Sequence, residues 1–159
     1  MAKILTAYFS ASGVTAKLAQ RFAKAVNSDL FEIKPVKPYT NADLNWMDSS
    51  SRSSVEMKNK SFRPEVAEKV ENMEQYDIIF VAFPIWWYVA PTIVNTFLEQ
   101  YDLSGKTVIP FATSGSSGMG NTNQELKGSC PGAVLKEGKR FASNAGAEEL
   151  KNWAEEAMR

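Results

Sequence analysis

Three loops carry residue types that could bind a small ligand, and the first of them is rich in hydroxyl groups. It reads Ser-Ala-Ser-Gly-Val-Thr from position 10 and leads into a helical pattern. The residues that we expect to contact a ligand here are Ser10, Ser12, Gly13, Val14 and Thr15. Hydroxyl groups can donate hydrogen bonds, glycine allows a close backbone approach, and a helix N-terminus offers free N–H groups to an anion. The loop therefore predicts a phosphate site, with plain helix capping by Ser12 or Thr15 as the alternative.

The second loop follows a nearly all-apolar run and is unusually aromatic. Trp86, Trp87 and Tyr88 follow one another directly after Pro84 and Ile85. Because successive side chains diverge, at least one of these rings should face outward. An aromatic ring exposed in a crevice suits stacking against a flat ring system. We expect one tryptophan to pack and the other to contact the ligand; the alternative is that a tryptophan only covers the edge of the sheet.

The third loop runs from Thr113 to Gly120 and is dominated by glycine and serine. Such a sequence forms no regular element, but it leaves backbone N–H and C=O groups free to meet a ligand that lies close. The residues that we expect to do so are Thr113, Ser114, Gly115 and Gly118. A flexible linker is the alternative, although a linker need not begin directly at the end of a buried strand.

The composition excludes several classes of chemistry. The chain of 159 residues has no histidine and one cysteine, Cys130, so histidine-dependent acid–base catalysis and metal sites built from His or clustered Cys are excluded. Eighteen basic residues balance eighteen acidic ones, which argues against binding to nucleic acid. We predict no catalytic side chain and no metal ligand. The first residues do not resemble a signal peptide and no apolar run is long enough to span a bilayer, so we expect a cytoplasmic protein that binds no membrane.

Apolar periodicity alternates between strand and helix along the chain. Strands are expected at 4–9, 30–33, 77–83, 106–112 and 133–135, the last of them continuing near Phe141. Helices are expected at 15–26, 64–73, 91–101, 120–129 and 146–158. This alternation predicts a single α/β domain over residues 1–159, a three-layer α/β/α arrangement with a five-stranded parallel sheet in the order 2-1-3-4-5. In that order a ligand binds where the first, third and fourth strands end, which is where the three loops begin.

A polar segment from Val36 to Phe62, hereafter the polar segment, interrupts this pattern and is expected to be a long connection. Long connections in small domains are often functional, although a solvated surface loop is the alternative. Beyond it, four acidic residues recur at helical spacing and predict a solvated face of the 64–73 helix. They are Glu65, Glu68, Glu71 and Glu74.

Together the loops offer a phosphate site, an aromatic platform and a backbone-lined surface. A flat aromatic molecule with a terminal phosphate would satisfy all three, and flavin mononucleotide (FMN) is the candidate. A phosphoryl-accepting signalling domain of the same topology is disfavoured, because Ser10 and Pro84 stand where that function requires acidic residues.

The chain resembles the short-chain proteins of the flavodoxin family over nearly its whole length. The resemblance is carried by Tyr8–Thr15, by Pro84–Trp87 with Ala90-Pro91, and by Phe111–Gly115; the region with Tyr39, Arg52, Glu56 and Pro64 is similar as well. It implies that the first loop holds the FMN phosphate and that Pro84–Trp87 and Thr113–Gly118 hold the isoalloxazine ring.

Two departures from the electron-shuttling members leave the function open. Those proteins are strongly acidic and stack a tyrosine from the third loop on the outer face of the flavin, whereas this chain is neutral and has no aromatic residue there. The flavin is then either open on one face or covered by Tyr39 or Trp46. We expect electron transfer through bound FMN with a redox partner protein; the alternative is an FMN-dependent NAD(P)H oxidoreductase that acts on quinones or similar acceptors. Either a monomer or a homodimer fits the sequence.

Overall fold

The computed structural model describes residues 3–11, 13–45, 47–59, 61–86, 89–113, 119–120 and 122–159. Its centre is a sheet in which every pairing is parallel, with the order β2-β1-β3-β4-β5 and a further strand, β6, beside β4. The strands are β1 (Ile4–Tyr8), β2 (Asp29–Glu32), β3 (Ile78–Pro84), β4 (Thr107–Thr113), β5 (Val134–Leu135) and β6 (Lys139–Phe141). The predicted strand order and parallel sheet are therefore confirmed, with a sixth strand attached.

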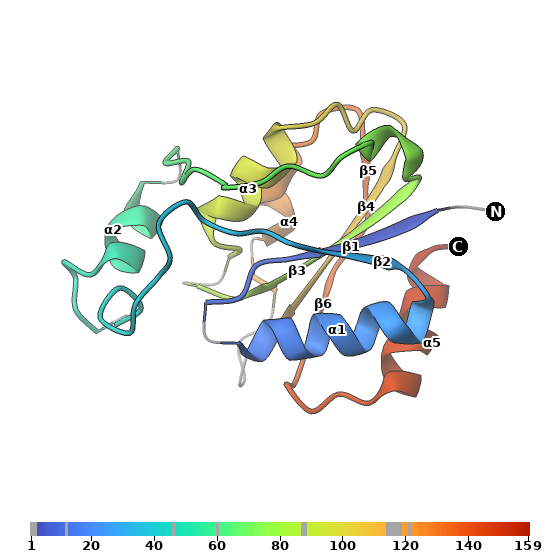
Figure 1. The fold of residues 1–159 in the computed structure, drawn as a ribbon, viewed down its shortest axis with the longest axis horizontal. Helices are drawn as coiled ribbons and strands as arrows, with labels where there is room; N and C mark the ends of the chain where they lie inside the picture. The colour runs from blue at the N-terminus through green and yellow to red at the C-terminus, as the bar shows by residue number, and fades with distance from the viewer. Residues whose placement is uncertain are drawn as a thin grey trace.

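Helices cover both faces of this sheet (Figure 1). They are α1 (Val14–Val26), α2 (Arg52–Lys58), α3 (Thr92–Glu99), α4 (Thr122–Lys127) and α5 (Ala147–Ala157), and a short 3₁₀ turn, η1, spans Met73–Gln75. Alternation along β3 shows the layering: Phe80 and Ala82 pack with α1 and α5, whereas Val81 and Phe83 pack with α3. Within the described residues no helix is both long enough and apolar enough to cross a membrane.

The last position in the sheet is shared by two short strands because a proline interrupts the ladder. Thr107 and Val108 pair with β5, and the residues from Phe111 onward pair with β6. The carbonyl of Val108 accepts the N–H of Lys136 at 2.9 Å, so Pro110, two residues on, faces the same neighbour and has no N–H to donate. Gly138 lies beside this break, where a Cβ would come within 2.5 Å of the Pro110 carbonyl oxygen.

One expectation for the region between β2 and β3 was wrong, and one helix there was not predicted. Residues 64–73 are not helical: Val66 bridges Pro35 in an antiparallel pair, and the Ala67 N–H donates to the Lys34 carbonyl at 2.7 Å. Glu71 lies in a turn and Glu74 in η1, so the four spaced glutamates do not share a helix face. The polar segment, in turn, contains a helix, α2, which begins after Ser51. Figure 1 shows that the polar segment and α2 extend past the ends of β1 and β3.

Candidate functional site

The three predicted loops meet at the edge of the sheet where the parallel strands end, here called the carboxyl edge. The hydroxyl of Thr15, in the first turn of α1, lies 2.8 Å from that of Thr113 at the end of β4. The N–H of Ile85, just after β3, donates to the Thr113 carbonyl at 3.3 Å. Residues from all three loops are therefore in direct contact, as the strand order requires.

Among the described residues of the first loop, no side chain caps the start of α1. Gly13 occupies the position before the helix with φ +92°, a left-handed conformation that favours glycine, and its N–H donates to the Ser10 hydroxyl at 3.0 Å. Nothing lies within 4 Å of where a Gly13 Cβ would be, and no acidic residue occupies the first turn. The free N–H groups of this turn and the positive end of the helix dipole therefore favour an anion.

Beside the second loop, three aromatic rings contact one another edge to face. Phe9, Tyr39 and Trp86, hereafter the aromatic cluster, have ring centroids 5.6 Å (Phe9–Tyr39), 5.5 Å (Tyr39–Trp86) and 5.7 Å (Phe9–Trp86) apart. Trp86 also exchanges backbone hydrogen bonds with Val89, at 2.9 and 3.2 Å, which ties the two flanks of the loop together. Such T-shaped contacts are a preferred geometry for aromatic pairs.

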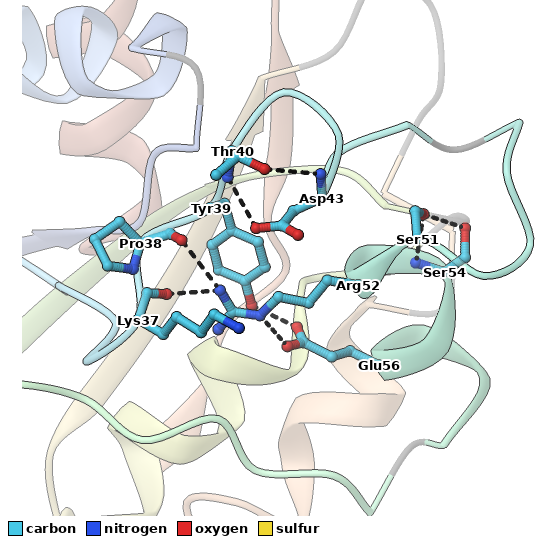
Figure 2. Close-up of polar contacts among 9 residues, drawn as sticks. All are labelled: Lys37, Pro38, Tyr39, Thr40, Asp43, Ser51, Arg52, Ser54 and Glu56. Atoms are coloured by element: carbon cyan, nitrogen blue, oxygen red, sulfur yellow. Dashed lines mark hydrogen bonds and ion pairs between the residues drawn. The ribbon is translucent and has the colours of Figure 1, made fainter.

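Tyr39 reaches the aromatic cluster from the polar segment and is held there by two residues of α2 (Figure 2). Its phenol donates to Oε1 of Glu56, and the Arg52 guanidinium lies over its ring, 3.8 Å from the centroid. Arg52 Nε donates to Glu56 Oε2 at 2.8 Å, which closes a triangle of contacts. Burial and the hydrogen bond to Glu56 raise the pKa of Tyr39 above its usual range, so the phenol stays protonated and remains a donor at neutral pH.

The structure describes only part of the predicted site. Ser10, Gly13, Val14, Thr15, Pro84, Ile85, Trp86 and Thr113 all lie at the carboxyl edge, in the loops or at the element ends beside them. Ser12, Trp87, Ser114, Gly115 and Gly118 fall outside the described residues, as does Trp46. The ligand-contact roles of all these residues, described or not, stay predictions.

Phe9 and Tyr39 are the residues of this edge that loop composition alone did not indicate. Phe9 is fully buried just after β1, and the apolar pattern predicts it as the last residue of the first strand. Tyr39 was singled out through the family resemblance and as one candidate to cover the ligand. Its contact with Trp86 depends on the path of the polar segment, for which the local sequence holds no signal.

A family profile described as flavodoxin matches residues 3–157. The chain belongs to the flavodoxin family. A protein of Bacteroides uniformis ATCC 8492 that is provisionally classed as a flavoprotein is 48% identical to this flavodoxin-family chain, with a TM-score of 0.91 and coverage of 97% of this chain and 98% of the other. A similarly classed protein of Bacteroides eggerthii DSM 20697 is 45% identical, with a TM-score of 0.93 and coverage of 100% and 99%.

More distant relatives share the fold. A flavoprotein from Lactobacillus acidophilus NCFM, solved in complex with FMN, is 23% identical to this flavodoxin-family chain, with a TM-score of 0.72 and coverage of 97% and 99%. A search among curated proteins gave no match.

Proposed function

We propose that this chain binds FMN at the carboxyl edge and transfers electrons through it. The observation that carries the proposal is the direct contact among the loops: an uncapped helix start, the Thr15–Thr113 hydroxyl pair and the aromatic cluster lie along one edge. Membership in the flavodoxin family and a structural relative solved with FMN support the same choice of ligand.

The first loop fits a phosphate group. A phosphate at the start of α1 would meet the N–H groups of the first turn, which no acidic side chain there opposes. The Thr15 hydroxyl is held at 2.8 Å from Thr113 and can direct its proton to a ligand while it accepts from that neighbour. Neutral donors suffice for phosphate recognition here because hydrogen bonds to a charged oxygen are stronger than those between neutral groups.

The aromatic cluster fits the flat ring of the cofactor. Trp86 is partly buried, so part of its indole remains accessible while it packs in T-shaped contacts against Phe9 and Tyr39. FMN would supply the one- and two-electron chemistry, and the chain would bind, orient and shield it. Histidine is absent from the chain, and no acid–base side chain is needed for this role.

The proposal is tested by FMN titration of the apoprotein, followed by flavin fluorescence. The variant Ser10→Ala/Thr15→Val removes two hydroxyls from the first loop, and we expect at least about tenfold weaker binding because hydrogen bonds to charged groups contribute roughly 1.5–3 kcal/mol each. Thr6→Val is the matched control, because Thr6 is a buried threonine whose hydroxyl lies 2.6 Å from that of Ser28, in the interior of β1. Its affinity for FMN should equal that of the wild type.

Anaerobic addition of NADH or NADPH to the FMN complex then separates two roles. A flavin that stays oxidised supports an electron carrier that depends on a protein reductase. Rapid bleaching would instead assign an NAD(P)H oxidoreductase activity. A wild-type chain that binds no FMN would overturn the proposal.

A further inference from the structure

We propose that Arg52 and Glu56 are positioning residues that hold Tyr39 against Trp86, so that the polar segment completes the ring-binding side of the site. The inference rests on the proposed function, and it assigns a role to a part of the chain outside the three loops. Neither Arg52 nor Glu56 belongs to the aromatic cluster; both would act through Tyr39.

The first argument is the way in which the polar segment is attached. The chain on either side of it is joined at the base, where the Val36 N–H donates to the Glu65 carbonyl at 3.0 Å beside the Pro35–Val66 bridge. These base contacts fix where the polar segment leaves the sheet. The orientation of the part beyond the base depends on contacts that this part itself makes. The contacts of Tyr39 with Phe9 and Trp86 join that part to the ends of β1 and β3.

The second argument is that Arg52 and Glu56 restrain Tyr39 from several sides. Glu56 holds the phenol, and Arg52 covers one face of the ring. Arg52 Nη1 also donates to the carbonyls of Lys37 and Pro38, at 2.6 and 3.3 Å, and so fixes the backbone just before Tyr39 (Figure 2). With the tip, one face and the preceding backbone all held, the ring keeps a fixed orientation within the polar segment, and this orientation is the one that meets Phe9 and Trp86.

The third argument is the burial of the charges. Glu56 is only 4% exposed, and among the described residues its Oε1 accepts from Tyr39 and its Oε2 from Arg52. A buried ion pair is costly to desolvate, and apolar residues of similar volume are often at least as stabilising. Beyond apolar packing, such a pair fixes the relative positions of the groups that it contacts. Here the group whose position it fixes is the ring of Tyr39.

The test compares two tyrosines that make the same bond at different places. Tyr39→Phe keeps the ring and removes the bond to Glu56. Tyr76→Phe, the matched control, removes a phenol bond of 2.6 Å to Asp29, near the starts of β2 and β3. For each protein the FMN affinity and the visible circular dichroism of the bound flavin are measured, the latter because it reports the ring's surroundings. Urea unfolding confirms that each variant is folded.

We expect Tyr39→Phe to bind FMN about fivefold more weakly, within the range of coupling between contacting residues, and to change the flavin's circular dichroism. Tyr76→Phe should change neither. Arg52→Lys, which keeps the charge but loses the planar stacking on Tyr39, should resemble Tyr39→Phe and serves as a second variant if that one is poorly folded.

A double-mutant cycle with Trp86→Leu shows whether Tyr39 acts through Trp86. In the Trp86→Leu background, Tyr39→Phe should have little further effect on affinity. A full, additive effect there would overturn the proposal, as would Tyr39→Phe and Arg52→Lys variants that match the wild type in affinity and circular dichroism. Both outcomes leave FMN binding by the wild type intact, whereas a wild type that binds no FMN would remove the proposed function as well.

Discussion

At each end of the sheet a tyrosine phenol donates to a carboxylate, but the two bonds join different kinds of element. Near the starts of the strands, Tyr76 donates to Asp29, the first residue of β2. Asp29 is part of β2 and Tyr76 lies two residues before β3, and both strands pair in register with β1, so the fold itself brings the two residues together. At the carboxyl edge, Tyr39 and its partner Glu56 both come from the polar segment, outside the sheet.

The difference separates what the fold needs from what a ligand site needs. The starts of the strands use short contacts between neighbouring elements, such as that of Lys106 Nζ with the Tyr76 carbonyl. The carboxyl edge instead joins loops to the polar segment, through side chains that lie outside the sheet. If this distinction holds, changes at the starts of the strands should affect stability alone, whereas changes at the carboxyl edge should affect stability and FMN binding together.

The largest expected effect follows from breaking the buried ion pair. Arg52→Ala leaves the Glu56 carboxylate buried with one partner fewer, and we expect a loss of about 3 kcal/mol in the free energy of unfolding. Lys34→Ala removes an ion pair with Glu68 near the base of the polar segment, in which the two charged atoms are 3.4 Å apart and both side chains are about half exposed. Its loss should lower the free energy of unfolding by less than about 1 kcal/mol. Urea unfolding of both variants measures the contrast.

The double variant Arg52→Ala/Glu56→Leu makes the comparison sharper. Removing both charges should restore much of the lost stability, because no buried charge is left unpaired. FMN affinity should stay low, since Tyr39 has lost both of its restraints. Recovery of affinity together with stability would show that the pair serves the fold and not the site.

Sequence reasoning succeeded for the elements that periodicity encodes. The buried faces of α1 and α5 repeat at helical spacing, and β3 and β4 are nearly continuous apolar runs, as expected for strands covered on both faces. The three loops were correctly placed at one edge because the strand order fixes where the strands end.

Sequence reasoning failed where contacts between distant residues outweigh local pattern. The glutamates after Pro64 have helical spacing, but the backbone at Val66 pairs with that at Pro35, thirty-one positions earlier, and this pairing requires an extended chain. Conversely, α2 is so polar that it carries no apolar stripe. Its signals were the Ser51 hydroxyl, which accepts the Ser54 N–H, and the i,i+4 pair of Arg52 and Glu56.

An intermediate effect on stability is expected from replacing either of two glycines that have a left-handed backbone conformation. Gly13, at the carboxyl edge, has φ +92°, and Gly105, just before β4, has φ +80°; neither has an atom within 4 Å of where a Cβ would lie. Alanine at either position should therefore cost about 1 kcal/mol of stability through backbone strain alone. Only Gly13→Ala should also weaken FMN binding, because the strain falls on the loop that meets the phosphate. Equal affinities of the two variants in the FMN titration would contradict the phosphate assignment.

The smallest effect is a difference in alkaline stability. Burial, followed by the hydrogen bond to Asp29 and its charge, raises the pKa of Tyr76 to about 12, from an ordinary value of 10.0. Because the folded pKa lies above the unfolded one, the stabilisation is complete below pH 10 and is lost as the pH rises towards about 12, where the unfolded phenol is deprotonated first.

Tyr76→Phe should therefore lose less stability than the wild type between pH 10.0 and about 12, as measured by urea unfolding at each pH. Tyr39→Phe should do the same, because the pKa of Tyr39 is also raised by burial and by Glu56. Here the two ends of the sheet are expected to behave alike, because burial of the phenol and its hydrogen bond to a carboxylate raise the pKa at both. If a Tyr→Phe variant lost as much stability at alkaline pH as the wild type does, the replaced phenol would not hold its proton more tightly in the folded chain than in the unfolded chain. For Tyr39, that result would also remove the hydrogen bond through which Glu56 is proposed to position the ring.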